Sequence, residues 1–251
     1  PLRRWVTHEG FNVRSGGAVG VPEFYDYDVA LVELERDVGS TGKPRRVCIP
    51  CTEDANRAMR KPPGTTCEEQ EAELLGRPRV AAEFMSLDGQ RMGVQVKNQQ
   101  AWAVCASGAT QAGMPYAGLE VGAVVTPRFL CSGQESGGPP EATTCKGESG
   151  GSLFLEMRHR FIQVGVVSWG TFNACQGGRR TAEGLLLRSP PPPGHQPRDF
   201  YVSLFRVQPW LRRVLGGALR FAPMRPMAGP TAASPVGHTA GPSHGSPVPP
   251  L

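Results

Sequence analysis

Residues 145–151, Cys-Lys-Gly-Glu-Ser-Gly-Gly, place a serine between glycines and are typical of a loop that presents a nucleophile. Glycine adopts backbone angles that other residues avoid, so a substrate carbonyl can approach the main chain there. The N–H groups of Gly147 and Ser149 would then stabilise a developing oxyanion, which is usually the largest catalytic contribution. Cys145 would hold the loop through a disulfide. A Gly/Ser-rich turn without a catalytic role explains the same residues, and the segment alone does not decide between the two.

A second candidate group is Asp28, which lies just before an apolar strand and between aromatic residues that shield it from water. A carboxylate there is either a turn residue with a satisfied side chain or a buried acid that orients an imidazole. For Asp28 taken alone, the turn is the simpler interpretation. The chain has five histidines: His8, His159, His195, His238 and His244.

Short apolar runs between turn residues predict many short β-strands, as in an all-β barrel or sandwich. We expect a helix over 67–75 that stops at Gly76, and a second helix within 202–215 that is closed by Gly216 and Gly217. The expected strands cover residues 29–34, 80–87, 92–97, 121–126 and 163–170.

The remaining segments predict irregular structure. After Trp5 and Val6 the first 20 residues are rich in glycine, and residues 188–197 form a proline-rich loop. Residues 47–51 are expected to cross between two halves of the molecule. Residues 218–251 contain mostly Pro, Gly, Ala and Ser and cannot bury enough surface to offset their ordering entropy, so we expect a disordered tail after a domain at 1–217.

Composition narrows the class of protein. Seven cysteines without paired zinc-ligand spacing indicate a secreted, disulfide-bonded protein with one unpaired thiol. The net charge of +5 comes from scattered basic pairs, and no basic stripe with interleaved aromatic residues predicts a nucleic-acid surface. No apolar run is long enough to span a membrane. We expect neither a metal nor a cofactor.

Taken together, four motifs resemble the chymotrypsin-like serine proteases from about residue 5 to 217. Further segments, such as residues 124–131 and 198–200, resemble the protease domains of complement factor B and component two, and the motifs do not separate these two relatives. The resemblance implies a double antiparallel β-barrel with a C-terminal helix. The four motifs are Tyr27-Asp28-Val29-Ala30-Leu31, the 145–151 loop, Val167-Ser168-Trp169-Gly170 and Gln208-Pro209-Trp210-Leu211.

The same resemblance implies roles for individual residues. Ser149 would attack the scissile carbonyl, Asp28 would orient the catalytic histidine, and the N–H groups of Gly147 and Ser149 would form the oxyanion hole. Ser168, Trp169 and Gly170 would pair with the substrate backbone as an added strand. The implied disulfides are Cys51–Cys67, Cys105–Cys131 and Cys145–Cys175, with Cys48 left unpaired.

The catalytic histidine of the family is absent from its expected position. Relatives carry it in an Ala-Ala-His-Cys segment well upstream of the aspartate, whereas His8 is only 20 residues before Asp28 and the other histidines follow Ser149. We therefore expect a truncated chain with an incomplete first barrel that is inactive alone. A pseudoprotease that binds without cutting, or a structural binding module, remains an alternative. An α/β-hydrolase is rejected because residues 137–146 are polar rather than an apolar strand.

The resemblance also implies a substrate. Thr143 stands where trypsin-like relatives have the acid that pairs with substrate arginine, but in the complement enzymes a later acid does so, at the position of Asp199. We expect cleavage after arginine in large thioester proteins, the third and fifth complement components, with an activated complement fragment as assembly partner. Glu148 replaces the aspartate that usually receives a newly cut N-terminus, and its partner is left open.

Overall fold

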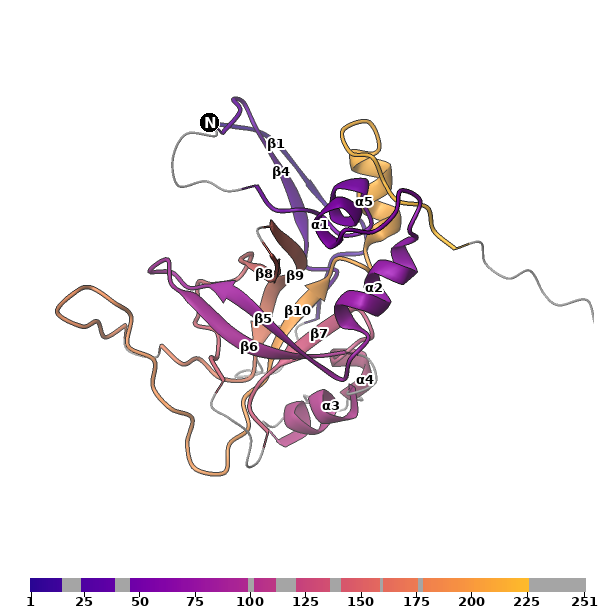
Figure 1. Cartoon of the computed structure of the whole chain (residues 1–251). Helices are drawn as coiled ribbons and strands as arrows, with labels where there is room; N and C mark the ends of the chain where they lie inside the picture. The colour runs from indigo at the N-terminus through magenta and orange to yellow at the C-terminus, as the bar shows by residue number, and fades with distance from the viewer. Residues whose placement is uncertain are drawn as a thin grey trace, which may run out of the picture.

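A six-stranded antiparallel barrel forms the centre of the molecule, closed in the order β10-β7-β6-β5-β8-β9 (Figure 1). The computed structural model describes residues 1–14, 24–38, 46–98, 102–111, 121–135, 141–158, 160–175 and 178–225. The barrel strands are β5 (Arg79–Met85), β6 (Arg91–Lys97), β7 (Phe129–Ser132), β8 (Ser152–Met157), β9 (Arg160–Gly170) and β10 (Asp199–Ser203). Alternate residues of β5 and β9 face inward, so Phe84, Ile162 and Val164 are completely buried.

Two smaller sheets precede the barrel. Strand β1 (Leu2–Thr7) pairs with β4 (Ala30–Leu34), and β2 (Asn12–Arg14) pairs with β3 (Phe24–Asp26), all antiparallel. The expectation of irregular structure after Val6 was wrong for Thr7 and residues 12–14, because they pair with long-range partners in 24–34. Residues 15–20 of that predicted segment lie outside the described residues. One closed barrel, two open two-stranded sheets and a C-terminal helix in the described residues confirm the predicted all-β, chymotrypsin-like fold.

In the described part of the chain, short helices lie between the strands, and a further one follows the last strand. The predicted helix at 67–75 is confirmed as α2, and its N-terminus carries a capping box between Thr66 and Glu69. Two predictions need correction. Residues 121–124 form a helix instead of a strand, and residues 202–203 belong to β10, so the C-terminal helix begins only at Gln208. The helices are α1 (Glu53–Met59), α2 (Cys67–Leu75), α3 (Trp102–Gln111), α4 (Val121–Val124) and α5 (Gln208–Leu215).

The three predicted disulfides are confirmed, and Cys48 is a buried free thiol. Cys51–Cys67 joins the segments that lead into α1 and α2, and Cys105–Cys131 joins α3 to β7. Cys145–Cys175 ties the serine loop to the segment that follows β9. Cys48 forms an isolated parallel bridge with Ile162 of β9, so residues 47–51 cross onto the barrel.

The end of the described chain packs back onto the molecule. The boundary predicted at residue 217 lies too early, because Ala222 is fully buried and its N–H donates to the Cys51 carbonyl at 2.8 Å. The N–H of Cys67 likewise donates to the Pro223 carbonyl. The predicted disordered tail from residue 226 onward lies outside the described residues.

Candidate active site

The serine loop alternates between buried and exposed residues. Gly147 and Ser149 are exposed, whereas Glu148 between them is buried. Gly147 has a φ of +100°, a conformation that favours glycine and lets the chain reverse there. Two backbone hydrogen bonds fasten the loop to β9: the N–H of Gly150 donates to the Val167 carbonyl at 2.8 Å, and that of Val167 donates to the Gly151 carbonyl at 2.9 Å.

The predicted oxyanion donors are free of intramolecular acceptors. Within the described ranges, the N–H groups of Gly147 and Ser149 donate to no backbone carbonyl, while the N–H of Glu148 is used in a turn to the Cys145 carbonyl at 3.0 Å. An exposed pair of N–H groups on either side of a buried residue can bind the oxygen of a ligand. This arrangement is chemically suited to an oxyanion hole.

Ser168 connects the two predicted catalytic residues. Its hydroxyl donates to the Asp28 carboxylate at 2.8 Å, and its carbonyl accepts from the Ser149 hydroxyl at 3.2 Å. The pKa of Asp28 is raised because partial burial disfavours the charged carboxylate, and the Ser168 hydrogen bond opposes this effect. Asp28 and Ser149, 121 positions apart in the sequence, thus reach the same short stretch of β9.

A β-bulge places Ser168 in this position. Trp169 pairs with Phe200 of β10, but the next paired residue of β9 is Val167 opposite Tyr201, so Ser168 is the extra residue. Bulges often redirect a side chain beside an active site. The register of β9 against β10 therefore determines which β9 side chain meets Asp28.

Asp28 follows a residue in an unusual conformation. Tyr27 has a φ of +54°, which is uncommon outside glycine. Its ring stacks on His8 with centroids 4.3 Å apart, and the Arg128 guanidinium lies 4.5 Å from the ring centroid. Arg128 also donates to the Asp26 carboxylate at 2.7 Å. This cluster holds the chain on both sides of Tyr27, and sequence reasoning assigned no role to Asp26 or Arg128.

None of the described imidazoles contacts Asp28 or Ser149. His8 is engaged with Tyr27, and its Nδ1 accepts from the Gly10 N–H at 2.9 Å. His195 lies in the loop before β10, with its ring 6.3 Å from that of Phe172. His159, His238 and His244 lie outside the described residues. The Ser149 hydroxyl donates to a carbonyl, which cannot accept its proton in a reaction, so a base must come from elsewhere.

A cavity of about 410 Å³ opens beside Ser149. Residues 144–146 and Ser149 line one side of it, and residues 167–173 line the other. The Trp169 ring in this wall is stacked on Phe200 at 4.0 Å. Ser168, Trp169 and Gly170, predicted to bind the substrate backbone, therefore lie together at this cavity. Trp169 and Gly170 pair with β10, and the pairing of β8 with β9 reaches only Val166, so β8 does not pair with residues 168–170.

Asp199 lies directly behind the cavity wall. It is completely buried, and its carboxylate accepts from the Thr144 N–H at 2.9 Å and from the Thr144 hydroxyl at 2.6 Å. A Cβ atom on Gly170 would lie 2.6 Å from Asp199 Oδ1, so glycine lets the wall approach the carboxylate closely. Burial raises the pKa of Asp199 to about 7, against the opposing effect of the Thr144 hydrogen bonds.

Thr143 and Thr144 differ in their surroundings. Thr144 lines the cavity and binds Asp199, whereas Thr143 does not line it, and its carbonyl accepts from the Arg188 guanidinium. Sequence reasoning singled out Thr143 and missed Thr144. Thr143 was singled out only because it lies six residues before Ser149. That spacing could not show which threonine contacts the buried Asp199 carboxylate.

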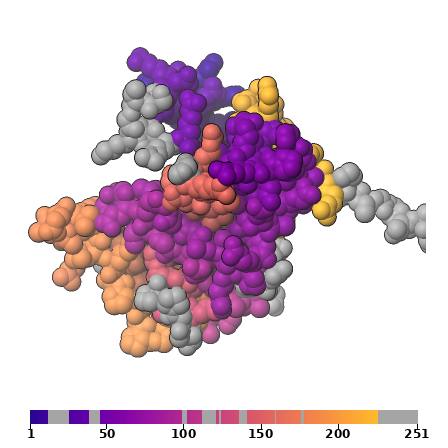
Figure 2. All heavy atoms as spheres, in the orientation of Figure 1, coloured from indigo at the N-terminus to yellow at the C-terminus, as the bar shows by residue number. Residues whose placement is uncertain are grey.

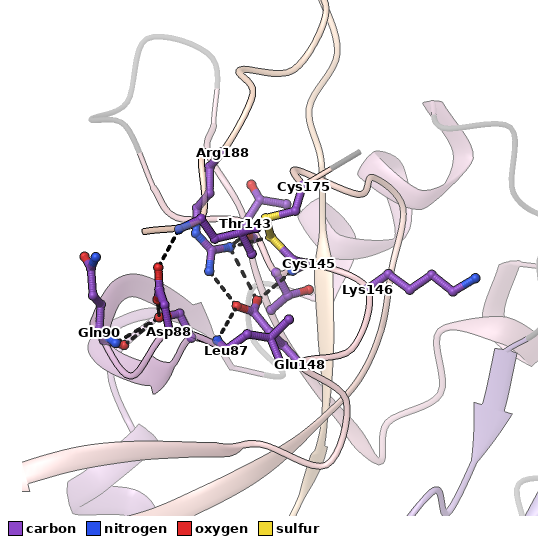
Figure 3. Close-up of polar contacts among 12 residues, drawn as sticks. Leu87, Asp88, Gln90, Thr143, Cys145, Lys146, Glu148, Cys175 and Arg188 are labelled. Carbon is purple, nitrogen blue, oxygen red and sulfur yellow. Dashed lines mark hydrogen bonds and ion pairs between the residues drawn. A yellow bond between two sulfur atoms is a disulfide. The ribbon is translucent and has the colours of Figure 1, made fainter. Parts of the chain in front are cut away.

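The open question about Glu148 has an answer in the structure: its partner is Arg188 (Figure 3). The Arg188 guanidinium lies 2.6 Å from Glu148 Oε1. The same carboxylate accepts from the Cys145 N–H at 2.6 Å and from the Leu87 N–H at 3.2 Å. Sequence reasoning assigned Arg188 only to a proline-rich loop.

Neither a metal site nor a membrane span is found in the described part of the chain. No group of three or more His, Cys, Asp or Glu residues within it could hold a metal ion. No helix within it is both long and apolar enough to cross a bilayer.

Comparisons with known proteins identify the family. The profile described as Trypsin matches residues 2–183. Complement C2 of Mus musculus is 44% identical over 216 residues, and complement factor B of Bos taurus is 41% identical over 219 residues. These alignments cover 86% and 85% of this chain but 28% and 27% of the respective relatives, so the chain spans less than a third of their length. The match to the Trypsin profile over most of the chain shows that this chain belongs to the trypsin family of serine proteases.

Proposed function

We propose that this chain is the protease part of a complement convertase-type serine endopeptidase. The observation that carries the proposal is the contact of Ser168 with both Asp28 and Ser149, beside a cavity lined by residues 167–173. The similarity to complement C2 and complement factor B supports the convertase branch of the family. Three disulfides support a secreted protein, because disulfides persist in oxidising compartments.

The proposed mechanism needs one group that the described residues do not provide. A histidine supplied upstream would stand between Asp28 and Ser149 and take the hydroxyl proton as Ser149 attacks the scissile carbonyl. Asp28 would stabilise the resulting imidazolium, and the N–H groups of Gly147 and Ser149 would bind the oxyanion. The imidazolium would then protonate the leaving amine, and water would release the acyl group from Ser149 by the reverse sequence.

Substrate binding would use the edge of β9 and the adjacent cavity. A peptide strand would pair with residues 168–170, where β8 provides no neighbour. An arginine side chain in the cavity would approach Asp199 through the wall formed by Thr144 and Gly170, and a guanidinium there would favour the ionised carboxylate. By similarity to complement C2 and factor B, we propose the third and fifth complement components as substrates and an activated complement fragment as assembly partner.

A binding role without catalysis is the second candidate. It is favoured by one observation: no described imidazole contacts Ser149 or Asp28. Such a pseudoprotease would still present the β9 edge and the cavity to a protein partner. The two functions differ in whether Ser149 turns over substrate once a histidine is supplied.

Activity should depend on an upstream histidine and on Ser149. We expect the 251-residue chain alone to hydrolyse arginine peptide amides no faster than background, because no described imidazole contacts Ser149. A chimera that carries the upstream part of the Mus musculus complement C2 protease domain should hydrolyse them. In the chimera, Ser149→Ala should lower kcat by at least about 10³-fold.

Steady-state kinetics of folded chimera and chain decide this prediction. A folded but inactive chimera would favour the binding function. Hydrolysis by the chain alone, abolished by Ser149→Ala, would show that one of its own five histidines is the base.

Selectivity for arginine should depend on Asp199. In the active chimera, Asp199→Asn should lower the ratio of kcat/KM for arginine over leucine peptides by about 100- to 1000-fold, because one member of a buried charge pair is removed. Asp54→Asn, which changes an exposed carboxylate of α1, is the matched control and should leave the ratio unchanged. An unchanged ratio in Asp199→Asn would assign arginine recognition, if present, to another residue.

A further inference from the structure

We propose that Arg188 is a positioning residue that supplies, from within the chain, the cation that orders the serine loop and its oxyanion donors. The inference deepens the proposed protease function and rests on it for its catalytic consequence. In most of the family the acid before the serine receives a new N-terminal amine. Here the acid is Glu148, and a guanidinium 40 positions downstream already occupies it.

The contacts of Glu148 require a cation. Its side chain has 0% exposure, and that of Arg188 has 17%. A buried carboxylate without a partner is strongly unfavourable because it has lost its hydration. Two guanidinium nitrogens of Arg188 face Glu148, at 2.6 Å from Oε1 and 3.4 Å from Oε2. Arg188 thus neutralises the only charge that the serine loop carries into the interior, since Lys146 is exposed.

Arg188 is itself held in place from several sides. Its guanidinium lies 5.6 Å from the centroid of the Phe84 ring and donates to the Thr143 carbonyl. Two residues earlier, the N–H of Leu186 donates to Asp88 at 2.7 Å, in the turn between β5 and β6. Figure 1 shows the loop between β9 and β10, in orange, extending beside this turn. The guanidinium is therefore fixed before any ligand binds.

Three segments meet at the Glu148 carboxylate. The β5–β6 turn donates the Leu87 N–H, the start of the serine loop donates the Cys145 N–H, and the loop before β10 provides Arg188 (Figure 3). Because Glu148 is drawn inward, its neighbours Gly147 and Ser149 remain exposed on either side. Without the cation, Glu148 would turn to solvent, and the loop that carries both oxyanion donors would rearrange.

Arg188 is a residue of the chain itself and lies five positions beyond the part that matches the Trypsin profile, residues 2–183. An internal cation makes the order of the serine loop independent of a newly cut N-terminus. We infer that the loop is ordered in the chain as it stands, before any histidine or substrate is supplied.

Amide hydrogen exchange measured by NMR on the 251-residue chain tests this directly. In Arg188→Met, the amides of Leu87 and Cys145 should exchange at least about tenfold faster, because their acceptor leaves. Arg188→Lys keeps the charge but loses the two-pronged contact, so its exchange should lie between those of the wild type and Arg188→Met. Arg91→Met is the control: Arg91 is also paired, with Glu83 and Glu156, but on the surface. Unchanged exchange at Leu87 and Cys145 in Arg188→Met would overturn the proposal.

A second variant covers the case in which Arg188→Met does not fold. The double variant Arg188→Met/Glu148→Gln removes both charges of this pair together and should fold, with a single cooperative thermal transition. If the double variant also fails to fold, Arg188 does more than neutralise Glu148 and the proposal is overturned.

The catalytic consequence is measured in the active chimera. Arg188→Met should lower kcat by about 100-fold or more while KM changes less than about threefold, because the oxyanion donors act mainly in the transition state. Arg188→Lys should restore most of kcat. An unchanged kcat in Arg188→Met overturns the proposal. A chimera that is inactive without any substitution counts against the proposed function only, since the exchange measurement in the chain still decides the role of Arg188.

Discussion

The carboxyl group of Asp199 is completely buried. Its two carboxylate oxygens are occupied by the N–H and hydroxyl of Thr144, and Gly170 covers it without a side chain. These two hydrogen bonds only partly offset desolvation, so the pKa lies near 7 instead of near 4. A folded-state pKa above the unfolded value means that the folded state binds the proton more tightly.

The pKa of Asp199 predicts a loss of stability as the pH rises. Its contribution is fully present below about pH 4, where both states are protonated, and is lost as the pH rises to about 7. The shift corresponds to about 4 kcal/mol of unfolding free energy. In Asp199→Asn this fall should disappear, whereas Asp28 and Glu71, whose pKa values are also raised by burial, continue to contribute in both proteins.

Denaturant unfolding between pH 4 and 7 measures this dependence. Asp54→Asn, which changes an exposed carboxylate of α1, is the control and should follow the wild type. If Asp199→Asn and the wild type lose the same free energy over this range, the Asp199 carboxyl is not the buried, protonated group described here.

At the scale of elements, the sequence was most informative where the pattern was local. The helix over 67–75 has its own caps, and strands 80–87 and 92–97 alternate largely as half-buried strands do. The three predicted strands 80–87, 92–97 and 163–170 overlap β5, β6 and β9, with ends displaced by at most three residues. Local signals sufficed because these elements satisfy their own backbone or pair with neighbours in sequence.

Two elements could not be predicted because their residues are buried, so the sequence lacks the polar–apolar periodicity that distinguishes a strand from a helix. Val124 and Val125 are both buried, and the N–H of Val125 donates to the Val121 carbonyl, so adjacent apolar residues at 121–125 indicated a strand where a helical turn formed. All five residues of β10 are buried on both faces. Together with Leu204 and Phe205, which follow directly, these residues have an apolar spacing that resembles that of a helix. Only the pairing of β10 with β7 and β9 identifies the strand.

The candidate site, too, was predicted only in part from the sequence. Asp28, Ser149 and Ser168 were predicted from motifs, and the structure brings them together. The bulge that directs Ser168 depends on the register of two strands, and the pair of Glu148 with Arg188 depends on a loop that the sequence marks only by its prolines. Contacts between segments tens of residues apart leave no local pattern, so these parts required the structure.

At the scale of the whole molecule, the barrel is a closed sheet and the N-terminal sheet is an open one. In the closed order each barrel strand lies between two others, whereas the β1–β4 sheet consists of two strands. The inner face of that sheet packs through Val6 and Leu31 against the cluster that includes Trp210 of α5. Its outer face leaves Trp5 67% and Val32 57% exposed. Figure 2 shows these indigo strands projecting from the body of the molecule.

This difference predicts that the N-terminal sheet opens well before the barrel. A two-stranded sheet is marginally stable in water, and one covered face adds only part of the burial that the barrel strands have. Hydrogen exchange should therefore be at least about 100-fold faster for the amides of β1 and β4 than for those of β9 and β10. In the chimera, the upstream strands of the family barrel would cover Trp5 and Val32, and exchange in β1 and β4 should slow. Equal protection of both sheets in the chain alone would show that α5 already couples them into one cooperative unit.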